Sequence, residues 1–315
     1  MLVLIGIKYD IFSFSLPIKK DADVKIVKTM AVSRSSVDRQ NQEISEIVGS
    51  SNDLNDSISD DLEGEISKEL RLLTFNIRHG VNEKGEESLD SIIRSIKETK
   101  AEIIALQEVD RFMLRSGFKD QAKEIARALG YNYVYGETIN LLGIKYGNAI
   151  LSAYPIIEHE NNKLYSKEIE SRGLLKAVID VDGVLYNVYT THLGLNSEER
   201  IKQVEQINQI IEKDGADRII LMGDFNEEPY TTTMQQLSSM LVDSTEWIDG
   251  DIEFYTYAFY SDKPNTRIDR IYVGQNIEIQ DHYVIESEIS DHCMVVAIIS
   301  HINPIKEGTM TFIEN

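Results

Sequence analysis

Short apolar runs rich in β-forming residues recur from Leu70 to about residue 300, and amphipathic helical patterns separate some of them. The Asp182-Gly183 pair lies between two such runs and predicts a tight hairpin, whereas other runs are far enough apart for a helical crossover. Hairpins mixed with crossovers predict two sheets packed face to face, with helices on their outer faces. The predicted strands span residues 70–77, 102–109, 131–139, 146–156, 174–181, 184–193, 218–226, 267–273 and 291–299.

Four segments carry the periodicity of amphipathic helices. Ser88 is expected to be the N-cap of the first of them, and Gly130 is expected to end the second. In the third, Ile201 is expected to be the first of five apolar residues turned toward the core. The predicted helices span residues 88–100, 120–130, 197–214 and 231–241.

Polar side chains occur where the predicted buried strands end. Strand ends on one side of a sheet can converge in space although they are far apart in the sequence. Carboxylate and amide oxygens suit Mg²⁺ or Mn²⁺, and imidazoles suit proton transfer or phosphate contact. The residues concerned are Asn76, Glu108, His192, Asp224, Asn226, Asp269, Asp291 and His292.

Two short stretches allow an expectation about side-chain direction. Alternate residues of a strand point to the same face, so Asp224 and Asn226 are expected to project into one site while Phe225 packs inward. Asp291 and His292 are adjacent and would point apart on a regular strand. The pair is therefore expected at a bend, where both side chains can reach a shared centre.

Taken singly, each of these residues is more often a turn residue or a solvated strand end than a ligand. The ordered set TFN, QEVD, YGN, THLG, GDFNEEP, RIDRIYV and SDHCMV is more specific, and it resembles the endonuclease/exonuclease/phosphatase superfamily. That superfamily includes DNase I-like nucleases, neutral sphingomyelinases and inositol polyphosphate 5-phosphatases. The resemblance covers about residues 70–300. It implies a four-layered α/β sandwich, dependence on Mg²⁺ or Mn²⁺, and hydrolysis without a covalent intermediate.

The resemblance also implies a role for each matching residue. It places Asn76 and Glu108 at the metal ion, with Asp291 as the third candidate ligand. It places Asp224 and Asn226 around the attacking water and the scissile phosphate.

Histidines and further pocket residues follow from the same comparison of motifs. His192 is expected to contact the phosphate or the leaving group, and His292 to act as base or phosphate contact, oriented by Asp269. Asn148 and Tyr146 of YGN are further candidates for phosphate contact.

Several basic residues near these motifs could supply positive charge around the pocket. Arg111 and Arg115 are candidates for contact with the substrate, and Arg78, His79 and Arg172 could add to the charge. For each arginine the commoner alternative is a surface ion pair.

The expected function is Mg²⁺-dependent hydrolysis of a small or lipid-derived phosphodiester. The stretches QEVDRFMLRSGFKDQA and THLGLNSEERIKQ look like the bacterial metal-dependent hydrolase branch, which is nearer to sphingomyelinase-like phosphodiesterases than to DNA-repair nucleases. A metal-dependent nuclease is the first alternative. The net charge of −21 and the absence of a clustered basic stretch disfavour duplex DNA as a partner without excluding it. A non-catalytic scaffold is the second alternative, and the intact motif set argues against it.

Composition divides the chain into a catalytic domain at residues 70–303, an N-terminal region at residues 1–69 and a tail at residues 304–315. The N-terminal region contains an acidic stretch without aromatic residues, which predicts a flexible linker. Residues 1–20 are apolar but interrupted by charges, so they are expected either to associate with a membrane or to form a peripheral strand. Both a cytoplasmic location and a membrane-tethered or extracytoplasmic location in a bacterium fit. The single cysteine, Cys293, permits no internal disulfide and is expected to be a buried apolar residue.

Overall fold

The computed structural model describes residues 69–301, apart from residues 168–169, 216–217, 247–252 and 260–262. The expectations for residues 1–68 and 302–315, including membrane association through residues 1–20, lie outside the described residues.

Twelve strands form two sheets of six. The first sheet has the order β11-β12-β1-β2-β4-β3, and the second has the order β5-β6-β7-β8-β10-β9. The strands are β1 (Glu69–Asn76), β2 (Ile103–Arg111), β3 (Asn132–Leu141), β4 (Ile144–Ser152), β5 (Ile156–Leu164), β6 (Arg172–Val181), β7 (Val184–His192), β8 (Ile219–Asp224), β9 (Leu241–Asp243), β10 (Asp269–Gly274), β11 (Ile277–Ile285) and β12 (Met294–His301).

Each sheet is built around one parallel pair, and its other neighbouring strands run antiparallel. The pair β1–β2 is joined through α2 (Leu89–Thr99), and the pair β7–β8 is joined through α4 (Ser197–Asp214). In each sheet two further strands lie on either side of the parallel pair, and the strand next to the second member of the pair is β4 in one sheet and β10 in the other. The fold therefore contains two similar halves that the sequence does not display. The predicted pair of packed, mainly antiparallel sheets is confirmed.

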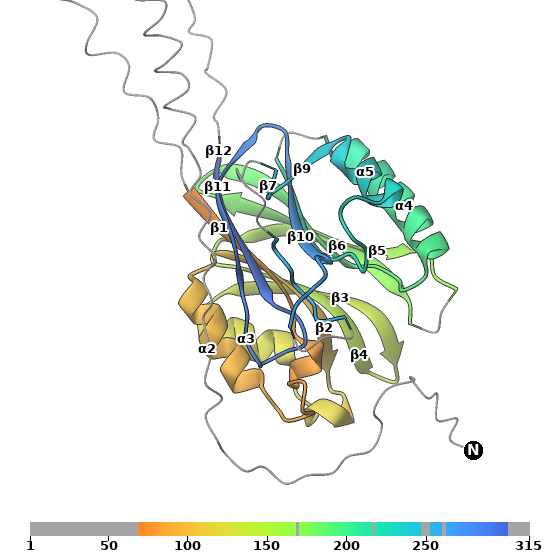
Figure 1. Cartoon of the computed structure of the whole chain (residues 1–315). Helices are drawn as coiled ribbons and strands as arrows, with labels where there is room; N and C mark the ends of the chain where they lie inside the picture. The colour runs from red at the N-terminus through yellow and green to blue at the C-terminus, as the bar shows by residue number, and fades with distance from the viewer. Residues whose placement is uncertain (1–68, 168–169, 216–217, 247–252, 260–262, 302–315) are drawn as a thin grey trace, which may run out of the picture.

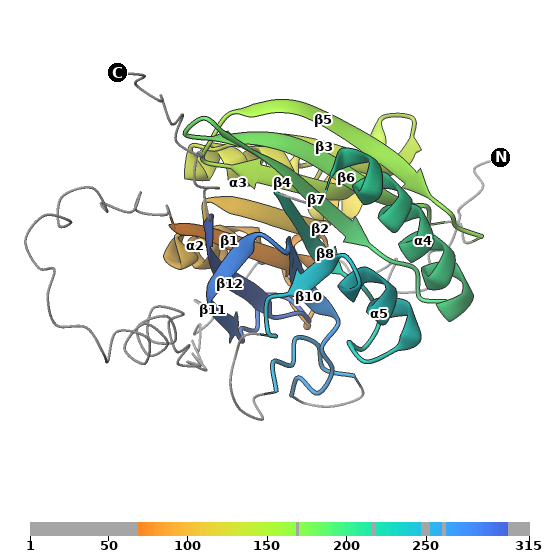
Figure 2. The ribbon, with the colours of Figure 1, turned by 90° about the horizontal axis from the view of Figure 1, so that it is seen from above.

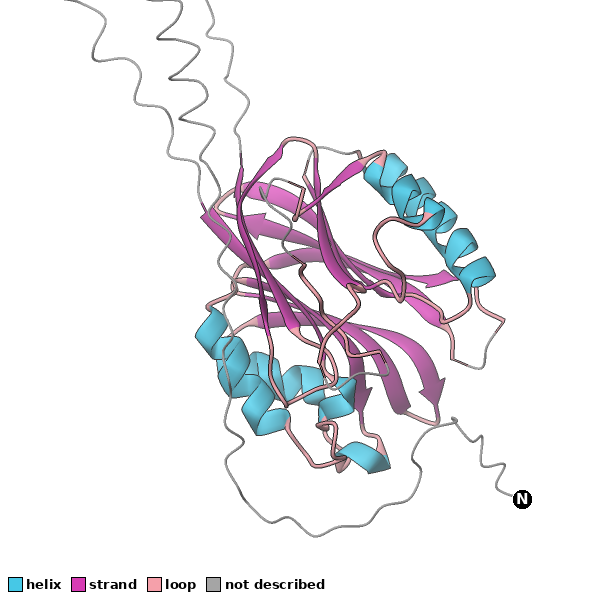
Figure 3. Cartoon of the chain, in the orientation of Figure 1, coloured by secondary structure: helices cyan, strands magenta, loops and turns pink. Residues whose placement is uncertain are grey.

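Helices cover the outer faces of both sheets, which gives four layers (Figures 1 and 3). The helices α2 and α3 (Gln121–Leu129) lie against the first sheet, and α4 and α5 (Thr232–Ser238) lie against the second. Seen from above, the two helix pairs are on opposite sides of the molecule (Figure 2). None of the helices in the described part of the chain is long and apolar enough to cross a membrane.

Three apolar clusters fill the spaces between these layers, and β1 shows how one strand serves two of them. Leu70 and Leu72 belong to the cluster between the sheets, whereas Leu73 and Phe75 belong to the cluster under α2 and α3. Because both faces of such a strand are buried, its sequence is a continuous apolar run. The third cluster lies under α4 and α5.

Several local expectations are confirmed. Asp182 and Gly183 turn the β6–β7 hairpin with φ angles of 54° and 89°, and Gly130 ends α3 in a left-handed conformation. Phe225 is fully buried, edge-to-face against Tyr272 at 5.3 Å between ring centroids.

Cys293 is buried as expected, and burial raises the pKa of its thiol. It is therefore an apolar core residue rather than a reactive thiol.

One local expectation is confirmed only in part and another is wrong, and each outcome has a physical reason. Ser88 is the N-cap residue of α2, as expected, but its side chain makes no capping hydrogen bond, and its hydroxyl is directed to the Ile289 carbonyl oxygen, to which it donates at 2.8 Å. Ile201 is 46% exposed, because the first turn of α4 buries the polar Glu199 instead, and the apolar part of the buried face begins at Val204.

Three strands were not anticipated: β5, β9 and β11. β5 reads IIEHENNKL, pairs only with β6 at the edge of its sheet and is largely exposed, so it lacks apolar alternation.

Candidate active site

The C-terminal ends of the central strands of both sheets meet through the side chain of Asn76, the last residue of β1. Its amide nitrogen donates to Glu108 Oε1 of β2 and to Asp224 Oδ2 of β8, each at 3.0 Å. Its amide oxygen accepts from the backbone nitrogen of Arg78, also at 3.0 Å. The buried amide therefore fixes two carboxylates that come from different sheets, as the sequence predicts for residues so far apart.

A backbone irregularity aims Glu108 at this centre. The pairing of β2 with β4 shifts register between Leu106 and Val109, and Glu108 adopts a φ of 57°. Bulges of this kind redirect a side chain, and a non-glycine residue at positive φ is typical of functional sites.

The environment of Glu108 favours its ionised form. Burial acts to raise the pKa of its carboxyl group, but His79, whose Nδ1 lies 3.7 Å from Oε2, and the Asn76 amide outweigh burial and hold the pKa below the usual range.

A buried acid–histidine chain lies beside this pair. His292 Nδ1 is 2.8 Å from Asp269 Oδ2, and His292 Nε2 is 3.6 Å from Asp224 Oδ2. Burial lowers the pKa of His292, but the charges of Asp269 and Asp224 outweigh it and raise that pKa to about 10. Burial and the Asp269 charge raise the pKa of Asp224 to about 7. His292 is therefore positively charged at neutral pH, and Asp224 can exchange a proton there.

His192 ends β7 directly opposite Asp224, with Nε2 at 3.5 Å from Asp224 Oδ2. Burial and the positive charge of Arg172 lower the pKa of His192 well below its usual value. The two imidazoles beside Asp224 therefore differ, because His292 is charged and His192 is neutral.

The GDFN stretch reaches the site in a different way from the one expected. The strand ends at Asp224, and Asn226 lies beyond it with a left-handed φ of 51°. The expectation that strand alternation directs both side chains into the site is therefore wrong. The Asn226 backbone nitrogen donates to Asp224 Oδ1 at 3.0 Å, and its amide donates to the Leu193 carbonyl oxygen at 2.9 Å. Gly223 is required, because a Cβ there would lie 2.1 Å from the Thr191 carbonyl oxygen.

Asp291 and His292 lie at a bend before β12, as expected. The Ser290 hydroxyl donates to the Asn76 carbonyl oxygen at 2.8 Å and lies 3.3 Å from Asp291 Oδ1, which places Asp291 beside the end of β1. Arg78 Nε is 3.5 Å from Asp291 Oδ2.

The two residues predicted from YGN line the same region from β4. Asn148 and Tyr146 are both buried, and the Asn148 amide donates to the Gly173 carbonyl oxygen at 3.5 Å. Burial and the charges of Glu108 and Glu170 raise the pKa of Tyr146 well above its usual value, so its phenol stays protonated.

Both candidate arginines, Arg111 and Arg115, form ion pairs with carboxylates, which is the commoner alternative to substrate contact. Arg115 binds Asp110 through two hydrogen bonds of 2.9 and 2.8 Å, and its guanidinium lies 5.3 Å from the centroid of the Tyr146 ring. Arg111 Nε is 2.8 Å from Asp120 Oδ2. Their contact with substrate stays a prediction.

Two residues near the site carry no motif that could have revealed them. Glu170 binds Arg172, whose side chain is only 3% exposed, at 2.7 Å, and burial raises the pKa of Glu170. Tyr257 packs against the His292 ring at 4.7 Å between centroids. Tyr257 comes from the long β9–β10 connection, where the sequence has no regular pattern.

Two groupings of acidic residues could hold a cation. Asp224, Asp269 and His292 have ligand atoms within 4.8 Å of one another, but all three are buried and Asp269 and His292 are hydrogen-bonded to each other. Glu108 and Asp291 have side chains that are 22% and 26% exposed, so their oxygens can reach a solvated ion.

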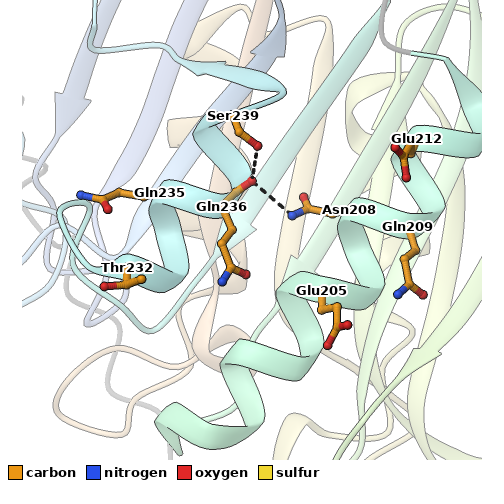
Figure 4. A pocket seen from close by; sticks show the side chains of 8 residues that line it. All are labelled: Glu205, Asn208, Gln209, Glu212, Thr232, Gln235, Gln236 and Ser239. Carbon is orange, nitrogen blue, oxygen red and sulfur yellow. Dashed lines mark hydrogen bonds between the residues drawn. The ribbon is translucent and has the colours of Figure 1, made fainter.

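A separate hollow of about 550 Å³ lies between α4 and α5, on the outer face of the second sheet (Figure 4). Its rim carries the carboxylates of Glu205 and Glu212 among amides and hydroxyls, with no basic side chain. It offers nothing to attract a phosphate, whereas the strand-end cluster combines acids with imidazoles and arginines.

The sequence profile of the endonuclease/exonuclease/phosphatase family matches residues 73–292, which include all the strand-end residues of the site. The chain belongs to this family. Members of the family are phosphoester hydrolases and are generally metal-dependent, so the chain is a hydrolase acting on phosphoric ester bonds.

Individual relatives are more distant. The protein YbhP of Escherichia coli (strain K12) is 27% identical over 169 residues, which cover 50% of this chain and 67% of YbhP. A family member from Beutenbergia cavernae superposes with a TM-score of 0.62 at 19% identity, covering 74% of this chain and 72% of that structure. A mannosyl-6-phosphatase from Bacteroides thetaiotaomicron gives 0.60 at 18% identity, covering 73% and 99%. These structural likenesses confirm the predicted four-layered, DNase I-like fold.

Proposed function

We propose that the chain is a Mg²⁺-dependent phosphodiesterase that hydrolyses a small or lipid-derived phosphoester by direct attack of water on phosphorus. The observation that carries this proposal is the bridging of Glu108 and Asp224 by the buried amide of Asn76. The bridge assembles acids from both sheets in one site, next to the charged imidazole of His292 and the neutral one of His192.

The charge of the site requires a cation before a phosphate can enter. Glu108, Asp224, Asp269 and Asp291 would repel an anionic phosphoester. Glu108 and Asp291 are the more exposed carboxylates, so we assign the metal ion to them. Asn76 turns its amide nitrogen toward Glu108 and Asp224, so the metal contact predicted for it would have to come from its amide oxygen, which also accepts from the Arg78 backbone nitrogen. Hard oxygen donors favour Mg²⁺ or Mn²⁺, and an ion bound there would offset negative charge on the phosphoryl oxygens.

Asp224 is the residue that we assign to activate the water. Its pKa of about 7 lets it accept a proton near neutral pH while the water oxygen bonds to phosphorus. Asn226 is tied to the Asp224 carboxylate through its backbone nitrogen, and it would orient the same water.

The two histidines beside Asp224 would have different roles. His292 carries a positive charge and is fixed by Asp269, so its Nε2 can hydrogen-bond a phosphoryl oxygen and stabilise the added charge. His192 is neutral and would hydrogen-bond the leaving-group oxygen while the bond from that oxygen to phosphorus breaks, and the departing alkoxide or phenolate would take its proton from solvent. Tyr146 and Asn148 would line the phosphate pocket from β4, with Arg115 behind Tyr146.

Hydrolysis of bis-p-nitrophenyl phosphate tests this proposal. We expect activity with Mg²⁺, loss of it with EDTA, and a fall of about 10²-fold or more for Glu108→Gln. Glu212→Gln removes the same charge from the distant α4–α5 hollow and should leave activity unchanged. Absent hydrolysis by folded protein would favour a non-catalytic scaffold, and hydrolysis that persists in EDTA would refute the metal dependence.

A substrate panel then separates the remaining candidates. Sphingomyelin, glycerophosphodiesters, plasmid DNA and sugar phosphates should be compared at equal enzyme and Mg²⁺ concentrations. We expect the lipid-derived or small diesters to be preferred. Preference for DNA would establish the nuclease alternative, which the net charge of −21 disfavours.

A further inference from the structure

Exposed large apolar side chains are concentrated at the end of the molecule that holds the candidate active site. Nine of the twelve in the described part of the chain lie in loops or hairpins there. Single exposed apolar residues are ordinary, but a concentration at one end indicates a binding surface. Six of the nine come from two segments, and we call them the apolar rim: Phe112, Leu114, Phe118, Leu141, Leu142 and Ile144.

The two segments of the apolar rim are neighbours in the fold. Arg111 at the end of β2 pairs with Lys145 of β4, and the β3–β4 hairpin turns immediately beyond that pair. The strands β2 and β4 lie side by side in Figure 1. Glu108 is three residues before Arg111 on β2, so the apolar rim borders the candidate active site.

The hairpin tip shows that the fold itself does not explain the apolar residues. Leu142 is 97% exposed and has a φ of 53°, followed by Gly143 at 89°. Such left-handed turn positions favour Asn, Asp or Gly. The tight β6–β7 hairpin has nearly the same angles and carries Asp182 at the equivalent position. Leu142 therefore costs stability and packs against nothing that compensates.

The neighbouring loop repeats this pattern. Phe112 and Phe118 are exposed at φ angles of 60° and 58°. The loop is closed by two backbone hydrogen bonds of 2.8 Å, from Phe112 to Lys119 and from Phe118 to Met113. The apolar side chains are therefore held outward by an ordered loop.

The local charge differs from that of the whole chain. Asp and Glu outnumber Lys and Arg by 53 to 32 overall, yet residues 111–119 and 141–145 contain no acidic residue. Their basic side chains lie at the base of the apolar tips and are paired with carboxylates from the strands and helices behind them. These basic residues are Arg111, Arg115, Lys119 and Lys145.

We propose that the apolar rim inserts into the surface of a lipid bilayer and so brings the active site to phosphodiester headgroups. Protruding apolar side chains above a ring of Lys and Arg are the pattern of interfacial membrane segments. A second copy of this chain is the alternative occupant of this face, and loss of self-association alone in the rim variant described below would indicate it. The proposal extends the proposed function by making a membrane phospholipid the substrate class.

Vesicle flotation with the full chain tests the proposal. The rim variant Leu114→Gln/Leu142→Asn removes two tips, and Asn suits the left-handed turn, so the variant should fold at least as well as the wild type. The matched control Ile157→Gln/Leu185→Gln removes two exposed apolar residues from the opposite end. On phosphatidylcholine vesicles containing phosphatidylglycerol, we expect the partition coefficient of the rim variant to fall about ten-fold or more.

Hydrogen exchange locates the contact. Vesicles should protect residues 112–118 and 141–144 in the wild type and in the control variant. Equal partitioning of the two variants, or protection confined to residues 1–20, would overturn the proposal, as would a rim variant that loses only self-association.

Soluble-substrate kinetics separate this proposal from the function on which it rests. All three proteins should hydrolyse bis-p-nitrophenyl phosphate equally, because the rim residues lie outside the catalytic cluster. Vesicle binding without any Mg²⁺-dependent hydrolysis would refute the proposed function and leave the membrane contact standing.

Discussion

Replacement of Asn76 by alanine tests whether one amide organises the site. The substitution removes donors from Glu108 Oε1 and Asp224 Oδ2, and it leaves the Arg78 backbone nitrogen without its acceptor. A hydrogen bond to a charged group contributes about 1.5–3 kcal/mol, and a neutral one about 1 kcal/mol. The lost bonds therefore amount to roughly 4–7 kcal/mol, and water entering the vacated space will return part of this.

We expect the free energy of unfolding to fall by about 2–4 kcal/mol, measured by urea denaturation at pH 7. Because the two carboxylates lose their relative position, kcat/KM on bis-p-nitrophenyl phosphate should fall by about 10²–10³-fold. Asn208→Ala, an exposed amide on α4 that donates only to the Gln236 carbonyl oxygen, is the control and should change neither quantity appreciably. Asn76→Ala with unchanged stability and activity would refute the central role of this amide.

Three further changes have defined outcomes. Asp269→Asn weakens the charge on His292, and kcat should fall by about 10²–10⁴-fold with little change in KM, measured by steady-state kinetics. Burial lowers the pKa of His282 to about 4, so the unfolded chain takes up a proton below pH 6.5 and the folded chain does not. The contribution of neutral His282 to the free energy of unfolding is therefore complete above pH 6.5 and is lost as the pH falls toward 4, by at most about 3 kcal/mol. His282→Gln should reduce the pH dependence of the free energy of unfolding between pH 6.5 and 4, measured by urea titrations. Leu142→Asn alone should leave the melting temperature unchanged or raise it, measured by calorimetry.

The strands that proved easiest to predict are those buried on both faces or joined by tight turns. The sequence around Leu72 and Leu73 is continuously apolar because the two residues face different apolar clusters. The Asp182-Gly183 pair is a specific hairpin signal because both residues tolerate the positive φ angles of the turn. The edge strand β5 has neither signal, since one side of it pairs with nothing in the described structure and most of its side chains meet water.

The membership of the site could be predicted more fully than its geometry. Strand ends identified Glu108 and Asp224, but only the fold shows that a bulge turns one of them and that Asn76 bridges both. Glu170 and Tyr257 could not be found, because they come from connections without periodicity and act through tertiary contacts. Ser88 is the N-cap of α2 as predicted, but the local sequence does not reveal that its hydroxyl donates to the distant Ile289 carbonyl oxygen and makes no capping bond.

Locating a bound metal ion is the most direct test of the proposed active site. A crystal soaked in Mn²⁺ should show an anomalous difference peak within coordination distance of Glu108, between the ends of β1 and β2 and close to Asp291. A peak only in the α4–α5 hollow, or none at the strand ends at saturating Mn²⁺, would contradict the account.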